Sequence, residues 1–267
     1  MPLVFRDGTV LPSGSYQERF RTGRWNRVPV VLGTNRDENK LFMFASPVWV
    51  RRWFGVVPRL REPASRYDAV AEYLARMWKA AGADEVATAM HASGASDVYV
   101  YRFDWDEEPT VLGADLSQML GACHGFEIPF VFGHFDLGAG SQRLFTPANA
   151  PGRTELAAAM TSYWTAFAAS GRPGRGRGDD LVAWPAWDDA ATFLVLDTSA
   201  SGGVRPATGA VTRDDVLAGI ERDPRLPTAR DRCLVYHDLV LYTDTVTPAD
   251  FTARCPGLPF DGYPWRT

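Results

Sequence analysis

Two adjacent carboxylates and a distant histidine are the residues of this sequence whose types suit proton transfer in catalysis. The stretch VVLGTNRDENKLF places Asp37 and Glu38 directly after a short apolar run, and GACHGFEIPFVFG places His124 between small residues. A carboxylate that accepts a hydrogen bond from one ring nitrogen of a histidine leaves the other nitrogen ready to take a proton from a nucleophile. By residue type and spacing alone a structural role is the more common one, because carboxylates often precede helices and lone histidines often pack.

The segment before the two carboxylates predicts a strand of a parallel sheet. Val28 to Leu32 is a short Val-rich run that ends at Gly33, which is typical of a strand covered on both faces. Residues just beyond the carboxyl end of such a strand face the crevice where open α/β sheets bind ligands. Asn35 to Glu38 are therefore expected at a functional edge of the sheet.

Strand-like and helix-like segments alternate along the rest of the chain. Asp97 to Phe103 is rich in Val and Tyr and predicts a second buried strand. Apolar residues at helical spacing predict helices from Arg66 to Ala80 and near residues 155–169, the second ending at Gly171. This alternation predicts an α/β fold. The chain beyond about residue 200 is polar with scattered prolines, and we expect it to wrap the surface.

Composition sets the outer bounds of the possible functions. With 267 residues, of which 46% are apolar, the chain is long enough for one large or two ordinary domains with a core. A net charge of −4 gives no reason to expect nucleic acid or an anionic membrane as a partner. No apolar run approaches the roughly 20 residues of a membrane span. The histidines show no close metal-ligand spacing, so no metal is expected.

The cysteines and the N-terminus leave the compartment open. Cys233 and Cys255 could bridge a small loop in an oxidising compartment, and two free thiols are about as frequent. The first residues, MPLVFRDGTVLP, lack the basic start and long apolar core of a signal peptide. Cytoplasmic and secreted locations are therefore not separated by the sequence.

Four segments, in the same order, resemble the type B carboxylesterase and cholinesterase family. RWNRVPVVLGTNRDENKLF (24–42) is similar to the family's acid segment, in which a strand runs into a G-T-N-R/K-D-E-G turn. GACHGFEIPFVFG (121–133) is similar to its histidine segment, H-G-x-E-I/L-x-F-V-F-G. SYWTAFAASGRP and LVAWPAWD resemble its W-x-x-F-A-x-x-G-x-P and W-P-x-Y-D stretches. The resemblance implies the C-terminal part of an α/β-hydrolase fold, with a partial, mostly parallel sheet flanked by helices.

The same resemblance implies a role for each residue of the candidate site. Glu38 corresponds to the acid of a Ser-His-Glu triad, His124 to its general base and Glu127 to a supporting carboxylate. Asp37 becomes a turn residue. Asn39 stands where the family usually has glycine, and Asn is the least costly substitute if that position requires a positive φ. The chain order, acid before histidine, is that of α/β-hydrolases.

Two phenylalanines near these residues have two possible roles. Phe42 and Phe126 could line an acyl or alcohol pocket, although aromatic residues more often serve packing. The chemistry implied by the resemblance requires no organic cofactor and no metal, and its substrate is a small-molecule ester.

The nucleophile of the family is missing from these 267 residues. The sequence contains no G-x-S-x-G elbow and no H-G-G-G-like turn for an oxyanion hole. The nearest pattern, SASGG, lacks the first glycine and follows the histidine instead of preceding it. We therefore expect the chain alone to be inactive, since loss of the serine of a triad costs on the order of 10⁶ in kcat.

The resemblance also predicts the domain organisation. We expect residues 1–200 to be the C-terminal part of a carboxylesterase type B domain, and residues 201–267 to be an extension packed on the same domain. An N-terminal part that carries the serine would complete the sheet, so the chain alone should expose an unpaired strand edge. The alternatives are a non-enzymatic, cholinesterase-like binding domain and a catalytically inactive remnant.

Overall fold

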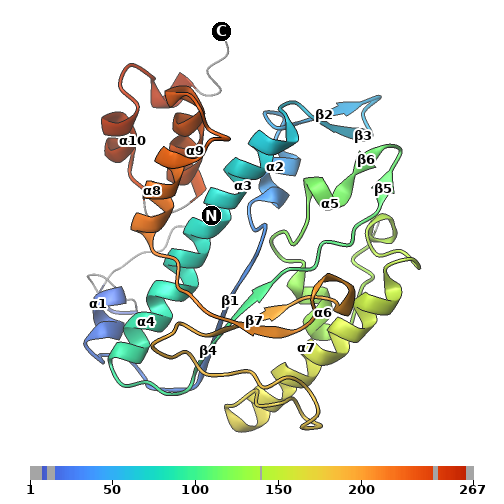
Figure 1. Cartoon of the computed structure of the whole chain (residues 1–267), viewed down its shortest axis with the longest axis vertical. Coiled ribbons are helices and arrows are strands. Elements are labelled where there is room, and N and C mark those ends of the chain that lie inside the picture. The colour runs from blue at the N-terminus through green and yellow to red at the C-terminus, as the bar shows by residue number, and fades with distance from the viewer. Residues whose placement is uncertain (1–7, 11–15, 139, 243–245, 263–267) are drawn as a thin grey trace.

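The chain folds around one mostly parallel sheet. The computed structural model describes residues 8–10, 16–138, 140–242 and 246–262 (Figure 1). Within these ranges, the strand order of the main sheet is β1 (Val30–Asn35), β4 (Val98–Phe103), β7 (Phe193–Leu196) and β8 (Arg205–Ala207). β1, β4 and β7 run parallel, and β8 is antiparallel to β7. The predicted α/β class is thus confirmed.

Two small hairpins and a set of helices surround this sheet. The hairpins are β2 (Val50–Trp53) with β3 (Val57–Leu60), and β5 (Thr110–Val111) with β6 (Ala114–Asp115). The helices are α1 (Tyr16–Arg21), α2 (Lys40–Ala45), α3 (Ala64–Lys79), α4 (Glu85–Ala92), α5 (Leu116–Met119), α6 (Glu127–Phe132), α7 (Ala150–Ser170), α8 (Arg213–Arg222), α9 (Ala229–Tyr242) and α10 (Pro248–Arg254). A π-helical turn, Ala80–Asp84, joins α3 to α4. In the part of the chain that the structure describes, no helix is both long and apolar enough to cross a lipid bilayer.

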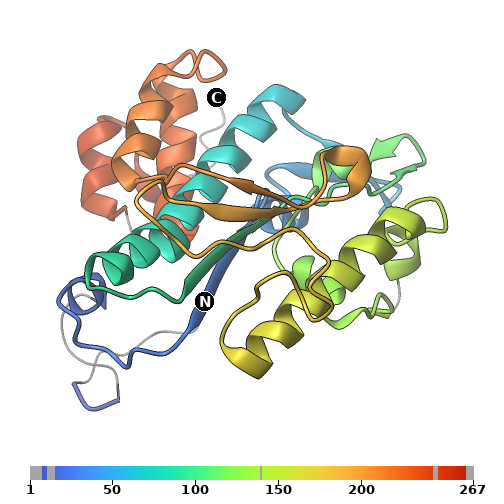
Figure 2. The ribbon, with the colours of Figure 1, turned by 60° about the horizontal axis from the view of Figure 1, so that its bottom comes forward.

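Helices cover both faces of the sheet, because successive side chains of a strand point to opposite faces. Figure 2 shows α3 and α4 on one side of the sheet and α7 on the other. The apolar cluster on the α4 side includes Val86, Met90, Val98, Val100 and Val195. The cluster on the α7 side includes Tyr99, Phe103, Leu156, Met160 and Leu196. The sheet is therefore the middle layer of three, as its apolar strands require.

β1 begins two residues later and ends three residues later than its apolar pattern predicts. The sequence placed this strand at Val28 to Leu32, closed by Gly33, but the strand continues through Gly33 to Asn35. Gly33 lies opposite Tyr101 of β4, and a Cβ at Gly33 would stand 1.9 Å from Cε1 of that ring. The glycine therefore makes room for the neighbouring tyrosine and does not end the strand.

The other predicted elements are confirmed, with shifted ends. α3 begins at Ala64 instead of Arg66 and runs directly into the π-helical turn. β4 begins one residue later than the predicted strand. α7 starts at Ala150, before the predicted range, and ends at Gly171, whose φ of 73° is the left-handed conformation that stops a helix.

The C-terminal segment forms helices around a core, so the expectation that it wraps the surface was wrong. α8, α9 and α10 pack with α3, and the buried residues of this cluster include Val70, Leu74, Val216, Ile220, Val235, Leu239 and Phe251. Val216 and Ile220 are four residues apart and therefore lie on the same face of α8. The charged residues around them make the segment polar on average, so its apolar face is not evident from the sequence. Cys233 of α9 forms a disulfide with Cys255, and Cys123 is a free, buried thiol.

Gly33→Ala should destabilise the protein through the contact with Tyr101. The added methyl group cannot fit beside the ring without moving β1 away from β4, and such overpacking costs about 1–3 kcal/mol. Gly82→Ala is the matched control, because its Cβ would come no closer than 3.6 Å to Trp78. Urea denaturation followed by circular dichroism measures both variants, and equal stabilities would contradict this account of Gly33.

Candidate active site

Glu38 and His124, the acid and base expected from the sequence, lie in direct contact. Nδ1 of His124 is 2.7 Å from Oε2 of Glu38, and the backbone N–H of His124 donates to the carbonyl oxygen of Glu38 at 3.2 Å. The side chain of Glu38 is 6% exposed, whereas that of His124 is 44% exposed. The structure thus joins a buried acid to an imidazole that reaches the surface. Their catalytic role stays a prediction.

Glu38 is held by the residues at the end of β1. Its Oε1 accepts hydrogen bonds from the backbone N–H of Asn35 at 2.8 Å and from the hydroxyl of Thr34 at 3.3 Å. Both carboxylate oxygens therefore have partners, which fixes the orientation of the side chain. The turn then leads into α2, and Asn39 precedes this helix with a φ of −81°. This position does not need a positive φ, so Asn39 fits it without strain.

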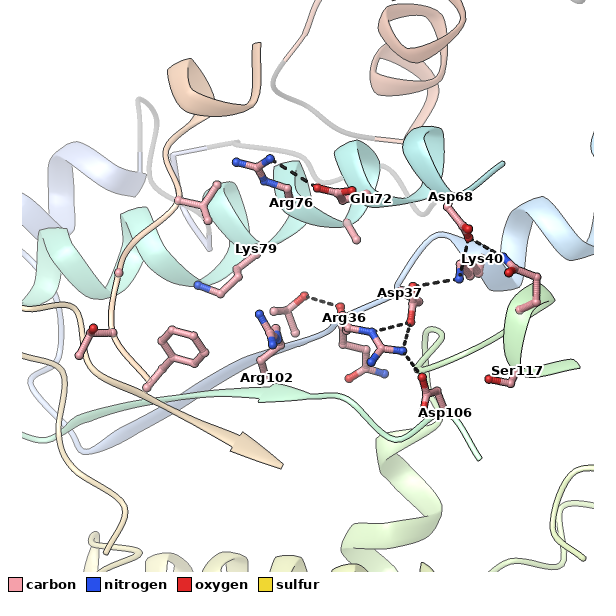
Figure 3. A pocket seen from close by; sticks show the side chains of 18 of the residues that line it. Arg36, Asp37, Lys40, Asp68, Glu72, Arg76, Lys79, Arg102, Asp106 and Ser117 are labelled. Atoms are coloured by element: carbon pink, nitrogen blue, oxygen red, sulfur yellow. Dashed lines mark hydrogen bonds and ion pairs between the residues drawn. The ribbon is translucent and has the colours of Figure 1, made fainter. Parts of the chain in front are cut away.

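Asp37 has none of the side-chain partners of Glu38, although the two residues are adjacent in the sequence. Its carboxylate forms ion pairs with Arg36 at 2.9 Å and Lys40 at 3.2 Å, and it accepts a hydrogen bond from the backbone N–H of Ala122 at 3.2 Å. Figure 3 shows this cluster in the wall of a cavity of about 690 Å³. Asp37 therefore anchors the turn to the loop that carries the histidine.

The cavity beside Asp37 is lined by balanced charges and does not contain the acid–base pair. Five basic and five acidic residues line it. Several of them are paired with each other, as Arg76 is with Glu72 at 3.6 Å and Lys40 with Asp68 at 3.2 Å. Phe42 is not among the lining residues. The cavity therefore offers no excess of one charge that would select an ionic ligand.

The imidazole of His124 lies against two aromatic rings. The ring centroids of Trp78 on α3 and of Phe42 are 5.1 Å and 5.5 Å from it. Phe42 also stacks on Trp78, with centroids 6.4 Å apart. Phe126 is instead buried in the core, with its ring 6.4 Å from that of Trp105. Of the two phenylalanines considered for a pocket, Phe42 lies beside the candidate base and Phe126 packs.

Contact with Glu38 raises the pKa of His124 above its ordinary value of 6.5. The largest cause is the side-chain hydrogen bond to Glu38, and partial burial opposes it. Because the pKa is raised in the folded state, the interaction stabilises the fold fully below about pH 6.5, and this stabilisation is lost as the pH rises through the folded pKa. With Nδ1 bound to the acid, Nε2 is the nitrogen that remains for proton exchange.

Asn35 joins the strand end to the histidine loop, a role that the sequence did not predict. Its side-chain amide donates to the carbonyl oxygen of Cys123 at 2.8 Å and to Oε2 of Glu127 at 2.5 Å. Asn35 is buried, with 2% of its surface exposed. Glu127 therefore accepts a hydrogen bond from Asn35, and its charge also raises the pKa of His124. Its role as a supporting carboxylate stays a prediction.

Among the described residues, neither a metal site nor a substitute for the missing serine lies at this position. The described residues contain no group of three or more His, Cys, Asp or Glu side chains arranged to hold a metal ion. Cys123 is adjacent to His124 but fully buried, and burial raises the pKa of its thiol. The thiol stays protonated at neutral pH and does not replace a serine.

Comparison with known proteins assigns the fold and then the family. The crystal structure of EstA from Aspergillus niger matches with a TM-score of 0.52 at 17% identity, over 91% of this chain and 46% of that one. Together with the sheet and its flanking helices, this similarity defines an α/β-hydrolase fold. The model of the carboxylesterase family matches residues 50–209, which is more than half of the chain. The protein belongs to the carboxylesterase family.

Individual relatives are longer than this chain. Para-nitrobenzyl esterase of Bacillus subtilis is 28% identical over 197 residues, which cover 68% of this chain and 37% of that protein. Carboxylesterase 5A of Mus musculus is 34% identical over 115 residues, which cover 43% of this chain and 19% of that protein. The chain thus spans less than half the length of these relatives. His124 and Glu127 lie inside the family match, and Glu38 lies just before it.

Glu38→Gln should lower the pKa of His124, because an amide does not stabilise the imidazolium as a carboxylate does. Titration of the His124 ring signals by NMR measures the shift directly. Glu62→Gln is the matched control, since Glu62 pairs with Arg66 at the surface. The assignment fails if Glu38→Gln leaves the pKa of His124 where Glu62→Gln leaves it.

Asn35→Ala should both destabilise the protein and disturb the acid–base pair. It leaves the carbonyl of Cys123 and the carboxylate of Glu127 without their buried donor, which costs about 1–3 kcal/mol. The histidine loop then loses its side-chain attachment to β1 and keeps only its hydrogen bonds to the turn that follows this strand, and the pKa of His124 should fall. Asn26→Ala, at an exposed position, is the control. Denaturation together with NMR titration checks both effects, and a purely structural role would change the stability but not the pKa.

Proposed function

We propose that this chain supplies the acid and the base of a serine carboxylic-ester hydrolase. The observation that carries the proposal is the 2.7 Å contact between Glu38 and Nδ1 of His124, in a chain that belongs to the carboxylesterase family. Relatives in that family are named as esterases. The serine and the oxyanion hole come from polypeptide outside these 267 residues, because the sequence holds neither pattern.

In the proposed reaction Glu38 orients His124, and His124 moves the proton. The serine oxygen attacks the carbonyl carbon of the ester while Nε2 of His124 takes the hydroxyl proton, and Glu38 stabilises the resulting imidazolium. His124 then returns the proton to the departing alcohol oxygen, which leaves an acyl-serine. A water molecule then attacks the acyl-serine in the same way. His124 takes the proton of the water and returns it to the serine oxygen, and the carboxylic acid is released. Burial of Glu38 strengthens its attraction for the imidazolium, because little water screens it.

The free edge of β1 is where we propose that the rest of the catalytic domain joins. β1 pairs with β4 on one side, and none of the described strands pairs with its other side. A further parallel strand on this edge would end beside Asn35, and the residues after it would arrive at Glu38 and His124. We further propose that residues 1–200 belong to this catalytic domain and that residues 201–267 are an extension packed on it, which adds β8 to the edge of the main sheet.

The coding sequence upstream of Met1 is the first test. We expect it to encode a G-x-S-x-G elbow and a Gly-rich turn, either in the same reading frame or in a separate one that yields a partner polypeptide. If neither pattern is encoded there, the proposal of ester hydrolysis fails for this protein, and the acid–base pair reflects only its ancestry.

The completed protein should hydrolyse p-nitrophenyl esters in a way that depends on the acid–base pair. His124→Ala should lower kcat by on the order of 10⁶ and Glu38→Gln by about 10⁴. His91→Ala is the control, because its imidazole pairs with Asp189 at the surface, at 3.2 Å. The 267-residue chain alone should give no burst of p-nitrophenol and no labelling by a fluorophosphonate. A serine-dependent burst from the chain alone would contradict the proposal.

A further inference from the structure

Two β-hairpins expose bulky apolar residues at their tips. In the β2–β3 hairpin Phe54 has a φ of 50° and Gly55 a φ of 75°, and in the β5–β6 hairpin Leu112 has a φ of 50° and Gly113 a φ of 72°. Phe54 is 95% exposed and Leu112 is 74% exposed. Each tip therefore holds a large apolar side chain in water and in the left-handed backbone conformation.

Neither feature helps the fold itself. Hairpin turns with two positive φ angles favour Asn-Gly or Asp-Gly, because a bulky residue in this conformation brings its Cβ too close to the following carbonyl oxygen. An exposed apolar side chain also gains nothing from burial. Backbone strain that is kept at an exposed position points to a function outside the fold. Here the combination occurs twice, at two neighbouring hairpins (Figure 1).

One arginine holds the two tips together. Nη2 of Arg59 on β3 donates to the carbonyl oxygen of Leu112 at 2.9 Å, and its guanidinium lies 5.5 Å from the ring centroid of Trp53. Trp53 is 47% exposed and Val56 is 64% exposed, so both extend the apolar area beside Phe54. Together, the exposed apolar side chains of both hairpins form the tip surface, which consists of Trp53, Phe54, Val56 and Leu112.

The tip surface is bordered by positive charge. Residues 48–61 contain four arginines and no acidic residue, and Arg51 and Arg52 are exposed. In the second hairpin, residues 110–115, the acidic residue is Asp115, whose carboxylate caps α5. The net charge of −4 for the whole chain therefore conceals a surface that is locally basic and apolar.

We propose that the tip surface adsorbs to an anionic lipid surface. Its protruding side chains enter the layer between lipid headgroups and acyl chains, where aromatic residues are favoured. The bordering arginines then lie at the depth of the lipid phosphates, which attract them. A protein partner would need walls that close around the apolar residues with dense packing. A convex tip fits a fluid interface instead, because lipids rearrange around it.

The proposal goes beyond ester hydrolysis and does not depend on it. Both hairpins lie at the carboxyl end of β1 and β4, the end that carries Glu38 and His124 (Figure 1). Adsorption through the tips would turn this end of the sheet towards the lipid, where apolar esters dissolve.

Flotation of the 267-residue chain with lipid vesicles tests the proposal. Bound protein rises through a density gradient with the vesicles, whereas aggregated protein stays at the bottom. The decisive variant is Phe54→Asn with Leu112→Asn, because Asn-Gly suits both turns and removes both apolar tips without loss of stability. Leu241→Gln, which removes a 53% exposed leucine from α9, is the matched control. The vesicles are phosphatidylcholine with or without phosphatidylglycerol.

We expect the chain to float with vesicles that contain phosphatidylglycerol and to be released by salt. The double Asn variant should weaken partitioning on the order of 100-fold with an unchanged or raised unfolding temperature, and Leu241→Gln should have no effect. Arg51→Gln should weaken it about fivefold. The proposal is overturned if the chain does not float, if the double variant floats as well as the wild type, or if phosphatidylglycerol makes no difference. Binding to an acidic polypeptide in the absence of flotation would assign the tip surface to a protein partner instead.

Discussion

The contact between Glu38 and His124 depends on the pairing of β1 with β4. Beyond the last paired residues of these strands, the backbone N–H of Arg36 donates to the carbonyl of Phe103 at 2.8 Å and that of Asp37 to the carbonyl of Ala122 at 3.0 Å. The N–H of His124 then donates to the carbonyl of Glu38. A line of backbone hydrogen bonds thus continues from the sheet into the histidine loop. These bonds position the acid and the base independently of the contact between their side chains. Sites built on such rigid elements hold their geometry more closely than sites on free loops.

The sequence could predict the strands and the first helices because their apolar residues follow a period, but periodicity carries no information about contacts between distant segments. Glu38 and His124 are distant in the sequence, and their pairing followed from resemblance to a family and not from spacing. Asn35 shows the limit more clearly. An amide at the end of a strand is not part of any sequence pattern. Asn35 contributes to the site because it donates hydrogen bonds to the carbonyl of Cys123 and to the carboxylate of Glu127, which lie in a segment far away in the sequence. Gly33 shows the opposite error, because a glycine that relieves a contact with Tyr101 was interpreted as the end of a strand.

Averages over long stretches concealed two further features. The helices after residue 212 carry many arginines and aspartates, so their mean polarity suggested a segment that wraps the surface. Buried residues such as Val216 on α8, Leu239 on α9 and Phe251 on α10 nevertheless give each helix a face that packs. The net charge of −4 likewise gave no hint of the acid-free segment 48–61. The informative quantities are local: the polarity of one face of a helix and the charge of one hairpin. Both are lost when polarity or charge is averaged over a long segment or the whole chain.

The two adjacent carboxylates have different partners, and this division leaves Glu38 to raise the pKa of His124. Asp37 takes both nearby side-chain cations, Arg36 and Lys40, into its own cluster. Glu38 is left with neutral donors at the end of β1 and with the imidazole. A buried carboxylate gains most from a cationic partner, and among the described residues His124 is the one that forms an ion pair with it. If Lys40 paired with Glu38 instead, the carboxylate would already be neutralised, and the imidazolium would lose most of its stabilisation. Asp37 thus anchors the turn to the histidine loop and, in doing so, pairs with the two basic side chains nearest to Glu38 in the sequence.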